Sequence, residues 1–288
     1  MPTSATGSRA PAAPEILRYG PLPDAAAVAR LIIEAAEAEV MPRFRRLLAH
    51  EVQEKARGEV VTVVDHAVER RLEAALRDLT PGSAVLGEEA AAADARRFDL
   101  LRGGEPVWIV DPLDGTSNFT GGVPVFALMV AFARSGEILQ GWIYDPVARR
   151  MASAARGEGA WCDGERLRVA PAGDPAAMTG ALLAGFFGRR DLARKLAARR
   201  DRVRTVPSLR CAGHEYLRLA GGRTQFALFS RLMPWDHAPG VLIHREAGGH
   251  GAYLEGGLFD PARIDASGLL LAPDRPSWEA LRHTLVGP

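Results

Sequence analysis

A short apolar run, residues 107–110, is followed at once by Asp111-Pro112-Leu113-Asp114-Gly115. Its β-branched and aromatic residues are typical of a strand buried on both faces of a sheet. Pro112 disfavours the helical conformation at Asp111 and keeps that residue extended. Because open sheets bind ligands beyond the carboxyl ends of their strands, we expect Asp111 to lie at a functional edge of a buried sheet.

The two aspartates of this segment, Asp111 and Asp114, are three residues apart. A turn between them would bring both carboxylates to one side, with the carbonyl of Leu113 between them. Carboxylate and carbonyl oxygens are the ligands that Mg²⁺ prefers. Gly115 and Thr116 follow at an expected helix start, where backbone N–H groups bind phosphate. The segment therefore predicts a metal-assisted phosphate site; the alternative is an Asx turn whose second aspartate has no function.

The order of the expected elements changes near residues 168–177. In the first part, the patterns predict helices over 24–48 and 65–79, a short β-branched stretch over 60–64 and strands over 83–87, 107–110, 123–132, 138–144 and 151–160. Asp24 is the expected N-cap of the first helix, Pro42 is expected to kink or stop it, and a tight turn is expected at Asp163-Gly164. In the second part, they predict strands over 181–185, 203–206 and 224–228 and helices over 192–198, 215–220 and 239–246. We predict a disordered tail over 1–14, an N-terminal α+β half over 15–170 and a C-terminal α/β half over 171–288.

The composition narrows the class of protein. Among 288 residues, 36 Lys and Arg face 35 Asp and Glu, and the net charge of +1 argues against a dedicated nucleic-acid binder. No apolar segment reaches the roughly 20 residues of a membrane helix, and residues 1–14 lack the apolar core of a signal peptide. Two cysteines cannot build a disulfide framework. We expect a cytoplasmic protein with no membrane and no nucleic-acid partner.

Two further acidic segments have ordinary interpretations when each is taken alone. Glu88 and Glu89 follow an expected strand, and adjacent glutamates usually form a solvated surface. Asp236 is interpreted as a helix N-cap, because Pro239 is tolerated in the first turn of the helix that would follow.

Taken together, the segments GEE (87–89), WIVDPLDGTSNF (108–119) and PWDHAPGVLIHREAGG (234–249) resemble the inositol monophosphatase family of Mg²⁺-dependent, lithium-sensitive phosphatases. The resemblance runs from the helix near Asp24 to Gly249. It implies a layered α-β-α-β-α sandwich of the inositol monophosphatase and fructose-1,6-bisphosphatase type, an α+β or α/β fold. It also implies a homodimer, the usual assembly of the family.

The resemblance assigns roles residue by residue. The positions that match the metal ligands of the family are Glu88, Asp111, the carbonyl of Leu113, Asp114 and Asp236. Thr116 matches the threonine that orients the attacking water together with Glu88, and Asp65 matches the acid beside it. Backbone N–H groups of Gly115 and Thr116 would bind the phosphate. Two or three Mg²⁺ ions and direct attack by a metal-activated water are implied, so the chain would be a phosphomonoesterase.

The substrate-recognition region departs from the family pattern. Relatives that prefer inositol phosphates have Gly-Ser/Thr-Ala-Ala where this chain has Arg210-Cys211-Ala212-Gly213, and a glutamate where it has Phe229. The loop 185–189 lacks the serine of those relatives. We assign Arg210, Ala212, His214 and Phe229 to substrate binding. For Arg210 the alternatives are a second anionic group or a plain surface position, and for His214 a substrate contact or a packed side chain.

For the remaining candidate residues, the sequence assigns no catalytic or metal-binding role. Lys55 is a candidate counterpart of a loop lysine in relatives. Cys211 has no evident His or Asp partner and receives no role as a nucleophile. The spacing of His237, His244 and His250 matches no tight zinc motif.

Three functions follow from these observations. The first is hydrolysis of a small phosphorylated polyol or sugar, with inositol monophosphate as the family default. The second keeps the chemistry and changes the substrate to a 3′-phosphorylated nucleotide, fructose bisphosphate or histidinol phosphate. The third is a non-catalytic role in binding RNA or the transcription machinery, against which the complete acidic set and the net charge of +1 argue.

Overall fold

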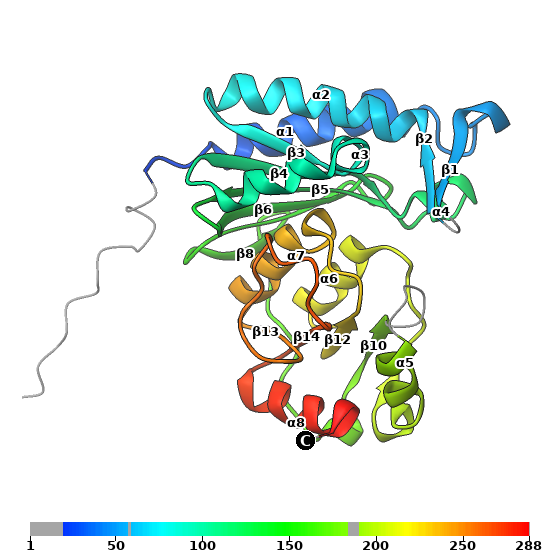
Figure 1. Cartoon of the computed structure of the whole chain (residues 1–288), viewed down its shortest axis with the longest axis vertical. Helices are drawn as coiled ribbons and strands as arrows, with labels where there is room; N and C mark the ends of the chain where they lie inside the picture. Colours follow the sequence, from blue (N-terminus) through cyan, green and yellow to red (C-terminus); the bar gives the residue numbers. More distant parts are fainter. Residues whose placement is uncertain (1–19, 57–58, 184–189, 288) are drawn as a thin grey trace, which may run out of the picture.

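The computed structural model describes residues 20–287 except 57–58 and 184–189, and the side chains of 55–59 and 190 are also not described. The predicted tail, the loop 185–189 and the side chain of Lys55 therefore lie outside the described residues. The chain forms five layers, in the order helices, sheet, helices, sheet, helices (Figure 1). The predicted α-β-α-β-α sandwich is thus confirmed.

The first layer consists of helices α1 (Ala25–Ala35) and α2 (Val63–Leu79). The predicted N-cap Asp24 is confirmed, since its Oδ1 accepts hydrogen bonds from the N–H groups of Ala26 and Ala27. After α1 the chain forms one π-helical segment, η2 (Ala36–Val40), and then turns. The helix thus stops before Pro42, where the sequence predicts a kink or a stop, and no α-helix follows it up to residue 48.

The second layer is a seven-stranded sheet with the order β3-β4-β5-β6-β7-β8-β9. Only β3 and β4 pair in parallel. Its strands are β3 (Ala84–Gly87), β4 (Pro106–Asp114), β5 (Ala127–Arg134), β6 (Glu137–Asp145), β7 (Arg150–Ala155), β8 (Gly159–Cys162) and β9 (Glu165–Arg166). The single strand predicted over 151–160 was wrong, because a turn with Gly157 at φ 81° divides it into β7 and β8. The tight turn predicted at Asp163-Gly164 is confirmed, with both residues at positive φ.

Short elements connect these layers at the edge where β4 ends. A hairpin of β1 (Val52–Ala56) and β2 (Glu59–Thr62) precedes α2. The remaining short elements are η3 (Ala49–Glu51), α3 (Glu88–Ala93), η4 (Ala95–Arg102) and α4 (Thr116–Thr120). Because α3 follows β3 and α4 follows β4, both helices begin at the carboxyl ends of the two parallel strands.

The second sheet has five strands in the order β11-β10-β12-β14-β13. They are β10 (Thr179–Leu183), β11 (Arg204–Thr205), β12 (Phe226–Phe229), β13 (His250–Tyr253) and β14 (Leu269–Ala272). The helices of this half are α5 (Arg190–Ala197), α6 (Ala212–Ala220), α7 (Pro234–Glu246) and α8 (Arg275–Val286), with the short η5 (Pro175–Ala177) and η6 (Arg200–Arg202). The first sheet ends at Arg166 and the second begins at Thr179, while the division at residue 170 stays a prediction.

Three apolar clusters hold the five layers together. One joins α1 and α2 to the upper face of the seven-stranded sheet, and a second joins its lower face to α6, α7 and the inner face of the five-stranded sheet. The third joins the outer face of the second sheet to α5 and α8. Strand β5 shows how the sequence does this: Val130 and Phe132 face the first cluster, and Met129 and Ala131 face the second.

Helix α7 lies between the two sheets and is buried around most of its circumference (Figure 1). It begins at Pro234, so the interpretation of Asp236 as the N-cap was wrong: Met233 is the N-cap and Asp236 lies within the first turn. Pro239 stands inside the helix. Gly141 on β6 makes room for it, because a Cβ there would lie 2.8 Å from the Pro239 Cα atom.

The imidazole of His244 is fully buried in α7, and neither of its nitrogens has a hydrogen-bond partner among the described residues. Burial lowers its pKa to about 3, well below the usual 6.5. Between those two pH values the unfolded chain binds one proton more than the folded chain does. The stability contributed by neutral His244 is therefore present above pH 6.5 and is lost as the pH falls toward 3.

We expect His244→Leu to raise the free energy of unfolding by about 1–2 kcal/mol at pH 7, because an apolar side chain replaces a buried group with unsatisfied nitrogens. Chemical denaturation from pH 7 to pH 4 should also show a smaller loss of stability than in the parent chain. Exposed His283→Gln serves as the control and should leave both quantities unchanged. If His244→Leu lowered the free energy of unfolding and left its dependence on pH unchanged, the neutral, unpaired state inferred for His244 would be wrong.

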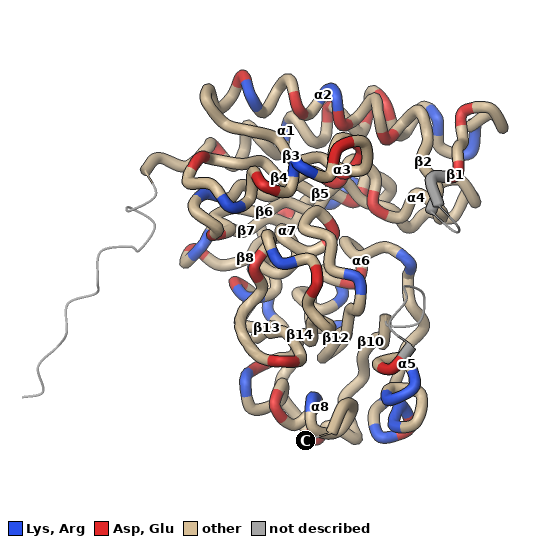
Figure 2. Tube along the Cα trace, in the orientation of Figure 1, with Lys and Arg blue, Asp and Glu red and all other residues tan. Residues whose placement is uncertain are grey.

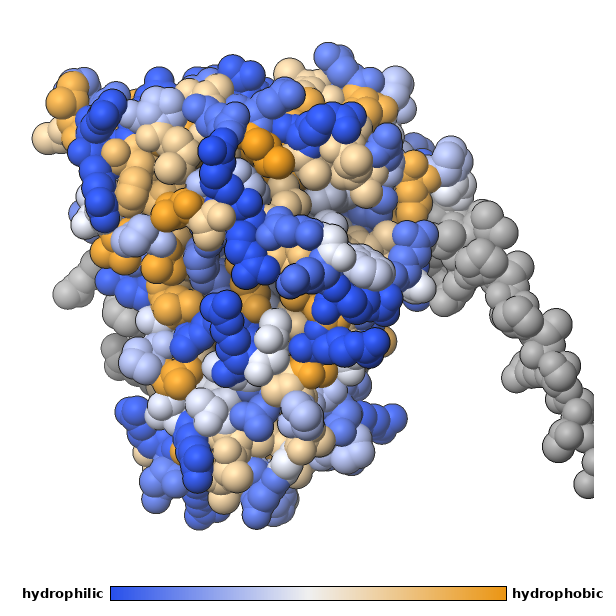
Figure 3. Space-filling view, turned by 180° about the vertical axis from the view of Figure 1, so that it is seen from behind, coloured by the Kyte–Doolittle hydropathy of each residue, from blue (hydrophilic) through white to orange (hydrophobic). Residues whose placement is uncertain are grey.

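The surface is mixed in character. On the face shown in Figure 3, hydrophobic residues lie in small groups between hydrophilic ones. Figure 2 shows acidic and basic residues interspersed along α2. Of the helices in the described ranges, none combines the length and the apolar character that crossing a membrane requires.

Candidate active site

Strand β4 continues through Asp111 to Asp114, four residues beyond the run predicted as a strand. Its pairing with β5 slips between Asp111 and Asp114, where two β4 residues oppose one residue of β5. Pro112 occupies this bulge, a position at which a strand tolerates proline. The Leu113 N–H donates to Asp111 Oδ1 over 3.0 Å. The bulge and this hydrogen bond change the direction of the chain between Asp111 and Asp114.

Five carboxylates from four elements converge at this strand end. Asp111 is fully buried, and burial raises its pKa well above the usual value. The negative charges of Glu88 on α3, Asp114 on β4, Asp236 on α7 and Asp65 on α2 raise it further, in that order. In Figure 2 acidic residues mark α3, which lies next to β3 and β4. The structure thus brings together all the carboxylates predicted for the site.

Asp65 and Thr116 meet at the centre of this cluster. The Thr116 Oγ1 atom lies 2.8 Å from the Leu113 carbonyl oxygen and 3.1 Å from Asp65 Oδ1, and its single hydrogen is donated to one of them at a time. Asp65 also accepts from the N–H and hydroxyl of Thr62 in a capping box. Burial raises the pKa of Asp65 to about 6 despite these hydrogen bonds.

Asp114 links the seven-stranded sheet to the N-terminus of α6. Its Oδ1 accepts from the Ala212 N–H over 3.0 Å, and its Oδ2 accepts from the Gly213 N–H over 2.6 Å. The Cys211 Sγ atom lies 2.9 Å from Oδ2. Burial first, and then the charge of Asp114, raise the pKa of Cys211 well above its usual value, so the protonated thiol donates. The prediction that Cys211 has no acidic partner was therefore wrong.

Three of the four predicted substrate residues have defined contacts, and these contacts are within the protein. Ala212 binds Asp114 through its backbone. His214 Nε2 lies 3.2 Å from the Phe126 carbonyl oxygen and 3.6 Å from Asp145 Oδ2. Phe229 is only 6% exposed and stacks on Tyr216, with ring centroids 5.4 Å apart. These positions favour packing for Phe229 and leave Arg210 as the exposed residue of the four.

A second hydrogen-bond network holds the start of α7, where Asp236 lies. The Tyr216 hydroxyl is 2.9 Å from His237 Nδ1, and His237 Nε2 is 2.8 Å from the Arg231 carbonyl oxygen. Since a carbonyl only accepts, Nε2 carries the hydrogen and Nδ1 accepts from Tyr216. Burial lowers the pKa of His237 to about 4, in keeping with this neutral form. The ordinary interpretation of His237 as a packed residue agrees with these contacts.

Sequence reasoning missed the acid that holds Glu88 and Glu89 in place. Buried Glu69 on α2 accepts from the N–H groups of Glu89 (2.8 Å) and Ala90 (2.9 Å) at the start of α3. Gly87 is required there, because a Cβ would lie 2.3 Å from the Glu69 Cδ atom. Glu89 is itself buried, so the solvated-surface interpretation of the pair was wrong. No residue next to the Gly-Glu-Glu motif points to Glu69, so local sequence patterns could not identify this contact.

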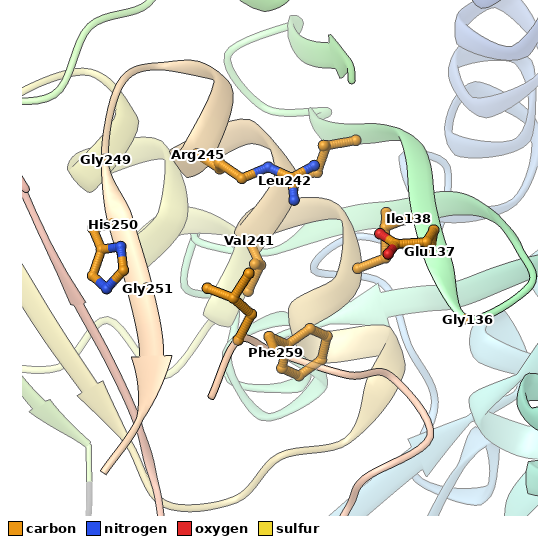
Figure 4. Close-up of a pocket in the computed structure, with 11 residues that line it drawn as sticks. Gly136, Glu137, Ile138, Val241, Leu242, Arg245, Gly249, His250, Gly251 and Phe259 are labelled. Carbon is orange, nitrogen blue, oxygen red and sulfur yellow. The ribbon is translucent and has the colours of Figure 1, made fainter. Parts of the chain in front are cut away.

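Two cavities of the described structure lie away from these carboxylates. One of about 60 Å³ is lined by the second half of α7, including Val241 and Arg245, and by the β5–β6 turn at Glu137 (Figure 4). Asp111 and Asp114 pair with Met129 and Ala127 near the start of β5, whereas the β5–β6 turn lies at its other end. Another, of about 200 Å³, lies between α5 and β10. Neither is lined by an acidic residue of the cluster.

The donor set suits a hard divalent cation, because it consists of carboxylates and one backbone carbonyl whose mutual repulsion such a cation relieves. In the described part of the chain, no three His, Cys, Asp or Glu side chains are arranged to hold a metal ion as they stand. In the structure, Asp114 accepts hydrogen bonds from the N-terminus of α6, and Asp111 accepts one from the Leu113 N–H. The residues fit Mg²⁺ by chemistry, and binding would need these carboxylates to reorient.

Comparison with known proteins gives matches over most of the chain. The model of the inositol monophosphatase family matches residues 24–285. Nus factor SuhB from Pseudomonas aeruginosa is 37% identical over 214 residues, which cover 72% of this chain and 76% of that protein. The inositol-1-monophosphatase of Rhizobium meliloti is 34% identical over 246 residues, covering 83% and 87%.

A solved structure with the same fold is the extragenic suppressor protein suhB from Bartonella henselae. Its TM-score is 0.75 at 26% identity, and the match covers 90% of this chain and 98% of that one.

Proposed function

Because the chain belongs to the inositol monophosphatase family, whose members are phosphatases, we propose that it is a Mg²⁺-dependent phosphomonoesterase acting on a small phosphorylated polyol or sugar. Membership confirms the resemblance found in the sequence motifs. The observation that carries the proposal is the convergence of Glu88, Asp65, Asp114 and Asp236 on buried Asp111. A homodimer in the cytoplasm is part of the proposal.

In the proposed reaction, Glu88, Asp111, Asp114, Asp236 and the Leu113 carbonyl would hold two or three Mg²⁺ ions. These ions, when bound, would neutralise charge on the phosphate and favour ionisation of the attacking water. Backbone N–H groups of Gly115 and Thr116 would bind the phosphate oxygens. Gly115 has a φ of 87° and no room for a Cβ, since the Val125 carbonyl oxygen would lie 2.9 Å away. This constraint fixes where these N–H groups point.

Thr116 and Glu88 would direct the water. The Thr116 hydroxyl donates to Leu113 or Asp65, so its lone pairs remain to accept a hydrogen bond from the water. Glu88 would take the proton that the water loses as it attacks phosphorus in line with the departing alcohol. The bond from phosphorus to the departing oxygen breaks, and the alkoxide takes a proton from a solvent water. The products are then inorganic phosphate and the alcohol, with no phosphorylated enzyme.

The proposal predicts that activity depends on the metal. Phosphate release should fall to background in EDTA and return when Mg²⁺ is added in excess. Thermal unfolding should show a higher midpoint with Mg²⁺ than with EDTA, since a ligand of the folded state alone stabilises it. Millimolar Li⁺ should inhibit, by analogy with the family. Full turnover in EDTA would overturn the metal assignment.

The substrate is tested separately. The chain lacks the Gly-Ser/Thr-Ala-Ala pattern at 210–213 and a carboxylate at Phe229. We therefore expect a panel to show no strong preference for inositol 1-phosphate over nucleotide 3′-phosphates, fructose bisphosphate and histidinol phosphate. Strong preference for inositol 1-phosphate would contradict an altered pocket.

The relative named Nus factor SuhB favours a second candidate, a binding role in transcription. An Asp111→Asn variant separates the two functions. If cells that carry Asp111→Asn keep the function of the parent chain although phosphate release is lost, the binding role is supported.

A further inference from the structure

The connection between β11 and α6 contains an arginine in an unusual backbone conformation. Arg210 is exposed, and its φ of 54° lies in the left-handed region that side chains other than glycine rarely adopt. Backbone outliers of this kind gather at ligand-binding sites. Building on the proposed function, we propose that Arg210 binds a second anionic group of the substrate. The phosphomonoester hydrolysed here would then carry a further phosphate or carboxylate.

Buried side chains fix the main chain before Arg210. The Leu209 N–H donates to Glu215 Oε1 over 2.7 Å, and the Leu209 carbonyl accepts from Asn118 Nδ2 over 2.8 Å. Both Glu215 and Asn118 are buried. The Arg210 N–H donates to the Ser208 hydroxyl. These bonds leave the segment little freedom to relax, so the left-handed conformation is held in place.

The same segment adjoins the acidic cluster. The residue after Arg210 is Cys211, whose thiol contacts Asp114, and the Ala212 N–H bonds to the same carboxylate. Asn118, which holds the Leu209 carbonyl, belongs to α4 directly after the expected phosphate-binding residues. The backbone of Arg210 therefore lies one residue from the wall of the site, on the side formed by α6.

The guanidinium of Arg210 has no hydrogen bond or ion pair within residues 20–56, 59–183 and 190–287. Arg218 on α6 differs: it pairs with Glu215 at 3.1 Å and lies within 3.4 Å of the Pro207 carbonyl oxygen. Arg210 is also not among the main charges that act on Asp111. An exposed guanidinium whose backbone adjoins the acidic cluster, and which has no partner among the described residues, suits bidentate binding of a phosphate or carboxylate.

Two matched substrate pairs test the proposal. Adenosine 3′,5′-bisphosphate is compared with adenosine 3′-phosphate, and 2-phosphoglycerate with glycerol 2-phosphate. The first pair tests a second phosphate, and the second pair tests a carboxylate. We expect kcat/KM to be about 10–100-fold higher for the doubly anionic member of at least one pair, from the strength of a charge-assisted hydrogen bond.

Arg210→Gln should remove that preference, mainly by raising the KM for the doubly anionic member of each pair. Arg210→Lys, which keeps the charge and loses the planar fork, should retain part of the preference. Exposed Arg204 on β11 provides the control, and Arg204→Gln should leave the preference unchanged.

Each contrary result has a defined meaning. Equal kcat/KM within both pairs for the parent chain, or an equal loss in Arg204→Gln and Arg210→Gln, would overturn the role of Arg210. The role of Arg210 would also be overturned if Arg210→Gln kept the parent chain's higher kcat/KM for the doubly anionic substrates. Absence of phosphate release from every substrate would instead overturn the proposed function.

Discussion

Asp111→Asn should abolish turnover and, in metal-free buffer, raise the melting temperature. Turnover should fall at least about 100-fold, because the central carboxylate of the proposed metal site is lost. Stability should rise because Asp111 is a buried charge that four other carboxylates repel. An asparagine Oδ1 can still accept from the Leu113 N–H, so the bulge survives. We expect a midpoint roughly 3 °C higher or more.

Calorimetric Mg²⁺ titration and thermal unfolding in EDTA check the two effects separately. Adding Mg²⁺ should raise the midpoint temperature of unfolding only slightly in the variant and clearly in the parent chain. Asp163→Asn, an exposed carboxylate in the β8–β9 turn, is a control for loss of a negative charge away from the cluster. Unchanged kinetics in Asp111→Asn would reject Asp111 as a ligand.

Gly240→Ala should cost about 3 kcal/mol of unfolding free energy. A Cβ at this position would lie 2.2 Å from the Cγ and Cδ2 atoms of Tyr216, whose ring is fully buried. The ring cannot easily yield, because its hydroxyl is bound to His237 and it stacks on Phe229. Since His237 neighbours Asp236, activity should fall together with stability.

Denaturant titration measures the loss, and Gly173→Ala is the matched control. No atom lies within 4 Å of a Cβ added at Gly173, and its φ is not in the left-handed region. The double variant Gly240→Ala with Tyr216→Leu should lose less stability than the sum of the single variants, because leucine vacates the contested space. Strict additivity of the two changes would show that the clash is not the cause.

Local patterns in the sequence predicted those features that depend on neighbouring residues. The Asp24 cap, the Asp163-Gly164 turn and the strand before Asp111 belong to this group. The family motifs named the carboxylates that the structure then brought together. These predictions succeeded because a cap, a turn or a motif is decided within a few residues of chain.

Contacts between distant segments were beyond local patterns. Nothing beside Glu88 shows that Glu69, 19 positions earlier, caps α3. Nothing beside Cys211 shows that Asp114 accepts from its thiol. The start of α7 was misplaced because Pro239 resembles a first-turn proline, and only the missing side chain of Gly141 explains how it fits further in.

Asp114 sits on a strand of one sheet and bonds to a helix of the other half, nearly 100 positions along the chain. A site built this way would need residues from both halves of the chain. If the polypeptide were cut between Arg166 and Thr179, neither piece alone would retain the Asp114–α6 contact, and only reassociation of both could restore it. Recovery of phosphate release when the two pieces are mixed would therefore measure how well the two halves reassociate.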